Sequence, residues 1–347
     1  MAQQHLDPTD PSLAGPVTGD ALAGYLRAQA TEFLRALRQH RESGGTATAG
    51  AVGAEEPVDA ARALRRSVRR ISASLHTFRP LLDADWSESL RPELAWLSGT
   101  LGMEHAYESR LERLLLALHR LSGAVFPTQA DRVTPPPSAP DRGNLTVGAA
   151  KAGALLDRQL TLARTRAHST ALQALGSSRF HAVADSIAVL ASEVPLTQKA
   201  TTTDLLPYAT AAQDRLQDAA TALPLVTAGH PYNAEALIHG LSPDPSPHPQ
   251  DAPWHQVRLL LRLHRYAQEV LEGAACADVR LLTAGQALDR HRDASEAAAA
   301  AASAARTPRI APATAYALGV LHADQRHEVE AARFAFQQCW QKETVRM

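Results

Sequence analysis

Apolar residues recur along the chain at the three- and four-residue spacing of amphipathic helices, and nothing reads as the strict alternation of a half-buried strand. Pro57 is placed to open one helix and Pro80 to end it. Leu101 and Gly102 suggest a break within the third helix. The predicted helices cover residues 20–43, 57–79, 86–121, 145–175, 179–194, 202–223, 254–272, 277–305 and 312–341.

The segments between these helices are rich in glycine, alanine and proline. We expect loops at 44–53, 123–143 and 224–253, the last two mobile because of their prolines. Residues 1–18 are polar and are expected to form a disordered tail. The remaining chain divides into a first helical bundle at 19–195 and a second at 196–343.

An internal repeat relates the two bundles. The helix at 57–79 contains Arg62-x-x-Arg65-x-x-x-Arg69-x-x-Ser72, and the helix at 254–272 contains His255-x-x-Arg258-x-x-x-Arg262-x-x-Arg265-Tyr266. Leu101-Gly102-x-x-His105-Ala106 follows the first pattern, and Leu288-Asp289-x-x-Arg292-Asp293 follows the second. Two anchors in the same order indicate a duplication. The predicted fold is therefore all-α, with two pseudo-symmetric four-helix bundles and a basic cleft between or along them.

The basic residues of the two repeated helices form stripes beside the apolar faces. At about 100° per residue, Arg62, Arg65, Arg69 and His76 share one flank of the first helix. Residues 57–80 contain six arginines and one acid, Asp59. Such a row of like charges loses stability by self-repulsion, which a bound anion would offset. The alternative is an ordinary solvated surface. Two unrelated surface helices would not be expected, however, to place their basic residues at the same positions relative to their apolar faces.

Composition narrows the function classes. The 347 residues contain 35 basic and 36 acidic residues, for a net charge of −1, so any polyanion site must arise from local clustering. There is no P-loop, HExxH or glycine-rich phosphate cradle, and few carboxylates on the stripes to hold a metal. We therefore expect no enzyme activity, cofactor or metal. Aromatic residues, 5% of the chain, are not interleaved with the stripe, which makes nucleic acid unlikely.

Targeting signals are not apparent. The N-terminal segment lacks the basic and apolar regions of a signal peptide, and no apolar run approaches the roughly 20 residues that span a bilayer. The two cysteines, Cys276 and Cys339, do not make a disulfide framework. We expect a cytoplasmic protein without membrane contact.

The chain resembles a known family in several motifs. Arg65-x-x-x-Arg69-Arg70, Phe78-Arg79-Pro80-Leu81-Leu82 and Leu90-Arg91-x-Glu93-Leu94-x-Trp96-Leu97 look like the first half of a conserved histidine α-helical domain (CHAD). The 255–266 motif with His291-x-Asp293 looks like its second half. The resemblance implies a basic cleft that binds inorganic polyphosphate without turnover, and association with polyphosphate granules or with CYTH-type triphosphate-handling enzymes. The implied polyanion-binding residues are Arg62, Arg65, Arg69, Arg70, His76, His255, Arg258, Arg262, Arg265 and His291.

The first half departs from the family pattern. Arg62 stands where the family has a histidine, and Ser72 and His76 stand at positions that are usually basic. Two alternatives therefore remain open: a helical protein-interaction or scaffold module that has lost the ligand, and a short-chain polyphosphate hydrolase. Insensitivity to salt would favour the first, and metal-dependent phosphate release would favour the second.

Overall fold

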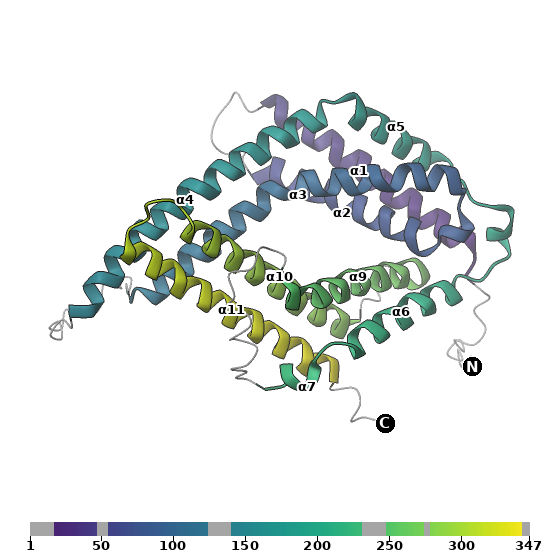
Figure 1. Ribbon diagram of the computed structural model, residues 1–347. Helices are drawn as coiled ribbons and strands as arrows, with labels where there is room; N and C mark the ends of the chain where they lie inside the picture. The colour runs from purple at the N-terminus through teal and green to yellow at the C-terminus, as the bar shows by residue number, and fades with distance from the viewer. Residues whose placement is uncertain (1–16, 47–54, 124–139, 231–247, 274–277, 342–347) are drawn as a thin grey trace, which may run out of the picture.

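The computed structural model describes residues 17–46, 55–123, 140–230, 248–273 and 278–341 (Figure 1). Within these ranges no strand is present, and Leu82 and Leu196 form an isolated bridge. The all-α prediction is confirmed. The helices are α1 (Gly19–Thr46), α2 (Glu55–Thr77), α3 (Ala84–Leu121), α4 (Pro140–Leu175), α5 (Ser178–Ser192), α6 (Leu206–Thr221), α7 (Leu225–Ala228), α9 (Ala252–Glu272), α10 (Val279–Ala305) and α11 (Pro312–Gln341), with short 3-10 turns η2 (Arg79–Leu81), η3 (Gln198–Thr201) and η4 (Pro249–Asp251).

Most predicted helix limits agree with the structure, but the predicted break in the third helix is wrong. Helix α3 runs for 38 residues through Leu101 and Gly102, both of which are buried. The helix continues because Leu94, Leu97 and Leu101 keep one apolar stripe in phase, and the packing offsets the low helix propensity of glycine. Gly102 is buried because the Arg65 side chain of α2 lies against it.

Some predicted loops contain structure, and others lie outside the described residues. Helix α4 begins at Pro140, inside the segment 123–143, and α7 and η4 lie inside 224–253. Nearly all of the predicted tail 1–18 and most of the predicted loop 44–53 fall outside the described residues.

Several helices begin at a residue whose side chain caps the backbone. Asp83 accepts a hydrogen bond from the Trp86 amide at 2.8 Å at the start of α3, and Asp278 does the same for the Arg280 amide at 2.8 Å before α10. Such caps satisfy amides that have no partner within the helix. They fix the starting points of two helices that carry basic residues of the candidate site.

Buried apolar side chains gather in three clusters. The first joins α1, α2, α5 and the N-terminal half of α3 around Phe33, Ile71 and Phe78, and it extends to α6 and α9. The second lies where α3 and α4 meet α10 and α11, and the third joins α6, α9, α10 and α11 around Trp254 and Phe336. In Figure 1, α1, α2, α3 and α5 form the upper part, and α6, α9, α10 and α11 the lower part. The second cluster thus connects the two parts through α4.

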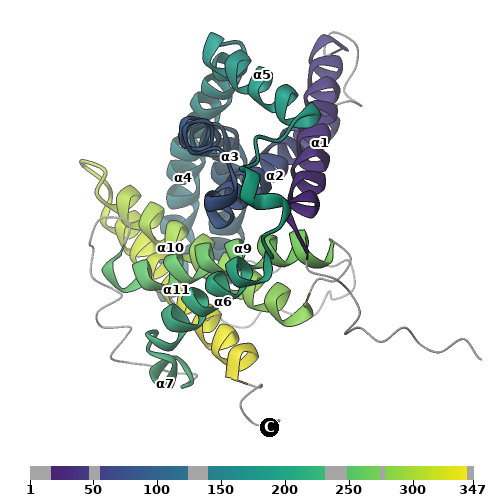
Figure 2. The same ribbon diagram turned by 90° about the vertical axis from the view of Figure 1, so that its right-hand side faces the viewer.

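Helices α2 and α9 come together where the two parts meet (Figure 2). Arg70 on α2 donates two hydrogen bonds to the Glu269 carboxylate on α9, from Nε at 2.7 Å and from Nη2 at 3.3 Å. The Tyr25 hydroxyl on α1 donates to the same carboxylate at 3.0 Å. This partly buried pair fixes the orientation of α2 against α9. As a result, the arginine flanks of both helices border a shared space.

Candidate functional site

Two arginines of α2 are held by one residue of α3. Arg65 donates from Nε to the backbone oxygen of Ser98 at 3.2 Å, and Arg69 donates from Nε to the Ser98 hydroxyl at 3.3 Å. Arg65 also lies directly over Gly102, where a Cβ atom would collide with its guanidinium group. The close approach of Arg65 therefore requires glycine at this position of α3.

Helix α9 supplies Arg258 and Arg262 from the same flank. Arg258 forms an ion pair with Asp289 of α10, with Nε 2.5 Å from Oδ1. Arg262 differs, because its Nε is buried without a hydrogen-bond partner among the described residues. A buried donor left unpaired costs free energy, so Arg262 is under-satisfied in the free protein.

Arg65, Arg69 and Arg262 border one or both of two adjoining cavities that share Arg65, whereas Arg258, paired with Asp289, is among the lining residues of neither. The first, here the α2–α9 cavity, has a volume of about 530 Å³. The second, here the α3–α10 cavity, has a volume of about 260 Å³. Together we call them the basic groove. The basic residues around the first are Arg65, Arg69, His76, Arg91 and Arg262, and those around the second are Arg65, His105, Arg110, Arg113 and Arg292.

Positive charge is unbalanced in the α2–α9 cavity. Burial is the main cause that lowers the pKa of Arg69 and of Arg262 to about 10, followed by the charge of Arg65 in the case of Arg69 and by the charge of Arg258 in the case of Arg262. Burial and the charges of Arg292, Arg262 and Arg258 also lower the pKa of Arg65. All three remain charged at neutral pH. No acidic residue is among the described residues that line this cavity, and the charge of Asp289, which is paired with Arg258, offsets the repulsion among the arginines only in part.

The α3–α10 cavity is closer to neutral. Arg110 lies 2.5 Å from the Glu296 carboxylate, and Arg292 lies 2.5 Å from that of Asp293. Arg113 donates to Gln325 at 2.6 Å. Ion pairs with these acids offset part of the positive charge, so the unpaired charge of the groove is concentrated around Arg65, Arg69 and Arg262.

Comparison with known proteins identifies the family. The family model described as the CHAD domain matches residues 28–302. The chain belongs to the CHAD domain family. PptA from Streptomyces chartreusis is 71% identical, with a TM-score of 0.78, over 94% of this chain and all of that chain. The CHAD domain from the plant Ricinus communis is 17% identical, with a TM-score of 0.46, over 95% of this chain and 97% of that chain. No curated protein matches.

The CHAD match includes every helix that borders the basic groove. Helices α2, α3 and α9 lie wholly within residues 28–302, and so does α10 up to its last turn. Helix α11 lies beyond the match. The groove is thus a feature of the CHAD domain itself, whereas the side chains that α11 contributes to the interior come from outside the matched region.

Three of the predicted polyanion-binding residues lie away from the groove. Arg70 is engaged by Glu269, whose hydrogen bond and charge raise the pKa of Arg70 although burial opposes this. Arg265 borders a different cavity of about 860 Å³, together with Glu269 and Glu272. His291 is 0% exposed and stacks on Trp254 with ring centroids 5.5 Å apart. Direct contact with a surface anion is therefore not available to His291.

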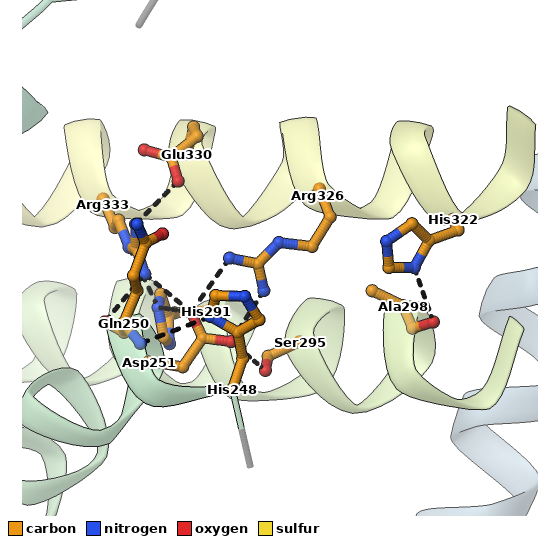
Figure 3. A network of polar contacts seen from close by, with 10 residues as sticks. All are labelled: His248, Gln250, Asp251, His291, Ser295, Ala298, His322, Arg326, Glu330 and Arg333. Carbon is orange, nitrogen blue, oxygen red and sulfur yellow. Dashed lines mark hydrogen bonds and ion pairs between the residues drawn. The ribbon is translucent and has the colours of Figure 1, made fainter. Parts of the chain in front are cut away.

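His291 belongs instead to a buried polar network (Figure 3). Its Nε2 accepts a hydrogen bond from Nε of Arg333 at 3.3 Å, and the pKa of His291 is well below its ordinary value because of burial and the Arg333 charge. The centre of the network is the Asp251 carboxylate. This network could not be predicted from local sequence patterns, because its members come from η4, α10 and α11.

Of the remaining predicted residues, His76 lines the α2–α9 cavity, whereas Arg62 and His255 line neither cavity. Arg62 approaches His105, with Nη2 3.4 Å from Nδ1. Nδ1 of His76 lies 3.1 Å from Nη2 of Arg91, and burial followed by the Arg91 charge lowers the pKa of His76. Burial also lowers the pKa of His255. Both histidines are therefore mainly neutral at pH 7 and gain charge only in more acidic solution.

Sequence reasoning did not select four arginines of the groove: Arg91, Arg110, Arg113 and Arg292. Arg91 and Arg292 stand inside the motifs of the family resemblance, so that signal could have found them. Arg110 and Arg113 gave no such signal, because acids are mixed with them along the helix. Among the described residues, no group of three or more histidine, cysteine, aspartate and glutamate side chains could hold a metal ion. None of the described helices combines the length and low polarity that a bilayer crossing requires.

Proposed function

We propose that this CHAD protein binds inorganic polyphosphate along the basic groove and does not turn it over. The observation that carries the proposal is the convergence of Arg65, Arg69 and Arg262 on one cavity whose described lining holds no acid. A polyphosphate chain supplies negative oxygens at every phosphate. Guanidinium groups can donate two parallel hydrogen bonds to such oxygens, which makes arginine well suited to an extended phosphate ligand.

An elongated ligand suits the groove better than a single phosphate. Arg65 borders both cavities, so a chain lying along the groove could contact Arg262 and Arg69 at one end and Arg292 at the other. Each contact would replace guanidinium repulsion by attraction. On this proposal the protein would associate with polyphosphate granules in the cytoplasm.

Binding is favoured over hydrolysis by the state of the nearby carboxylates. Asp289, Asp293 and Glu296 each lie within ion-pair distance of an arginine. Phosphoryl transfer generally requires carboxylates that hold a divalent metal and a group that positions the nucleophile. Carboxylates already engaged by arginine are poorly placed for that role.

Titration calorimetry with long-chain polyphosphate tests the proposal. We expect binding at about 50 mM salt that weakens at least about tenfold at about 200 mM salt, because bound phosphates release counterions. Incubation with polyphosphate and Mg²⁺ or Mn²⁺ should release no phosphate. Absence of binding at the lower salt concentration would overturn the proposal and leave the protein-interaction alternative. Metal-dependent phosphate release would favour the hydrolase alternative.

Replacing Gly102 by alanine should weaken polyphosphate binding by roughly tenfold. The new Cβ would displace the guanidinium group of Arg65 from its position between the two cavities, and one charged hydrogen bond contributes about 1.5–3 kcal/mol. Calorimetry at the lower salt concentration measures the change. Gly319→Ala on α11 is the matched control, since nothing lies within 4 Å of a Cβ there and Gly319 lines neither cavity. Equal binding by the two variants would show that the position of Arg65 does not matter.

A further inference from the structure

The α2–α9 cavity has an apolar wall in addition to its arginines. Leu94 and Ala95 of α3 and Leu259, Leu263 and Tyr266 of α9 border the cavity. Leu94 and Leu263 are buried, but the Leu259 side chain is 52% exposed, between Arg258 and Arg262 in the sequence. The cavity therefore offers apolar surface directly beside the unbalanced charges.

Inorganic polyphosphate cannot use this wall. The chain contains no carbon, and its charged oxygens lose hydration without compensation when they lie against apolar side chains. A single exposed leucine is ordinary on a protein surface. Several apolar side chains that border one concave space, with a few charged groups beside them, are instead typical of small-molecule sites.

We propose that the α2–α9 cavity binds the organic end of a phosphorylated compound, and specifically a nucleoside polyphosphate. The nucleoside would lie against Leu259 and Tyr266, and the phosphates would be bound by Arg69, Arg262 and Arg65. This inference rests on the proposed function of the basic groove as a phosphate-chain site, and adds a ligand class to it.

The dimensions of the cavities suit this class. A volume of about 530 Å³ lies within the range of small-molecule sites, roughly 300–1,000 Å³, and the adjoining 260 Å³ gives room for a phosphate tail beyond Arg65. The Tyr266 ring is held from one side by Arg70, whose guanidinium carbon lies 5.4 Å from the ring centroid. The guanidinium planes of the cavity arginines are themselves suited to stacking on a base.

Little discrimination among bases is expected. Neither asparagine nor glutamine is among the described residues that line the cavity. Their side-chain amides commonly form the hydrogen bonds that distinguish one base from another. The apolar wall contacts the face of a base and not its hydrogen-bonding edge. Purine nucleotides of equal phosphate number should therefore bind with similar affinity.

The test compares ATP with inorganic tripolyphosphate by calorimetry, at low salt and with a metal chelator. ATP carries no more negative charge than tripolyphosphate, so a site that reads charge alone gives it no advantage. We expect the wild-type protein to bind ATP at least about fivefold more tightly, from partial burial of the nucleoside on the wall. Leu259→Ser should remove this advantage and leave tripolyphosphate affinity within about twofold, because the arginines are unchanged. Leu116→Ser on α3, at a side chain that is 66% exposed and outside the lining of either cavity, is the matched control.

The outcomes separate this inference from the proposed function. Tripolyphosphate bound as tightly as ATP, or more tightly, would overturn the inference and leave the phosphate-chain site in place. An ATP preference that survives Leu259→Ser would also overturn it, because the wall would not be the cause. If neither tripolyphosphate nor long-chain polyphosphate binds, the proposed function fails and the inference fails with it.

Discussion

Replacing Asp251 by alanine is expected to lower the free energy of unfolding by about 3–5 kcal/mol, the usual cost of removing one partner from a buried ion pair. The Asp251 side chain is 0% exposed. Its Oδ2 accepts a hydrogen bond from Nη1 of Arg326 at 2.7 Å, and its Oδ1 accepts one from Nη2 of Arg333 at 2.6 Å. Without the carboxylate, the buried Arg326 guanidinium would lose its ion pair with Asp251, and the buried Arg333 guanidinium would be left with the Glu330 carboxylate.

The position of Asp251 in the chain enlarges the effect. Asp251 ends η4 and immediately precedes α9, and it also accepts a hydrogen bond from Ser295 of α10. Arg326 and Arg333 both come from α11 (Figure 3). One carboxylate thus links the start of α9 to two other helices, and its loss should loosen the helix that supplies Arg258 and Arg262.

Chemical denaturation at pH 7, followed by circular dichroism, measures the change. Asp324→Ala is the matched control: Asp324 pairs with the exposed Arg120 at 3.3 Å. A surface pair of this kind contributes at most about 1 kcal/mol. Equal losses in the two variants would show that the buried network adds nothing beyond a surface ion pair.

Acid solution gives a second readout of the same variant. Burial acts to raise the pKa of Asp251, but the hydrogen bond and charge of Arg326 outweigh it and hold this pKa well below the ordinary 3.8. The stability that the carboxylate contributes is therefore complete above about pH 3.8 and is lost as the pH falls through the lowered pKa. The difference between wild type and Asp251→Ala should accordingly narrow below pH 3.8.

Helices were predictable from the sequence wherever one apolar stripe stayed in phase. Helix α11 begins at Pro312 and ends at Gln341, as predicted, and α9 begins two residues before the predicted Trp254. The break expected at Gly102 was wrong for a specific reason. From the local sequence, a glycine within a helical pattern indicates low helix propensity and hence a break. At this position glycine is instead needed to make room for the Arg65 side chain, which is distant in sequence and lies on another helix.

The candidate site could be predicted only in part. The positions of basic residues along α2 and α9 predict Arg65, Arg69 and Arg262, because a stripe along one helix can be recognised from local sequence. Arg70 follows Arg69 directly in the sequence, but Arg70 forms an ion pair with Glu269 of α9 instead of bordering the groove. Partners of this kind depend on tertiary packing, which one sequence without its fold does not reveal.

The double variant Arg69→Leu/Arg262→Leu is expected to lose polyphosphate affinity by on the order of a thousandfold at low salt, from two charged hydrogen bonds at about 1.5–3 kcal/mol each. The same variant should be more stable than the wild type in the absence of ligand. At neutral pH, a guanidinium whose pKa is lowered from its ordinary value to about 10 opposes folding. This penalty is complete below pH 10 and disappears as the pH rises toward the ordinary pKa of arginine. Because solvent screens part of it, we expect a gain of about 1 kcal/mol.

Calorimetry and chemical denaturation of the variant measure the two effects, and Arg158→Leu/Arg166→Leu is the control. These two arginines are exposed on α4, so the control removes the same net charge away from the groove. Equal binding by both double variants would show that net charge, and not the groove, attracts the ligand. A variant that loses affinity and stability together would show that the arginines support the fold. Loss of affinity with a gain in stability would instead mean that the free protein retains unbalanced charge because the ligand requires it.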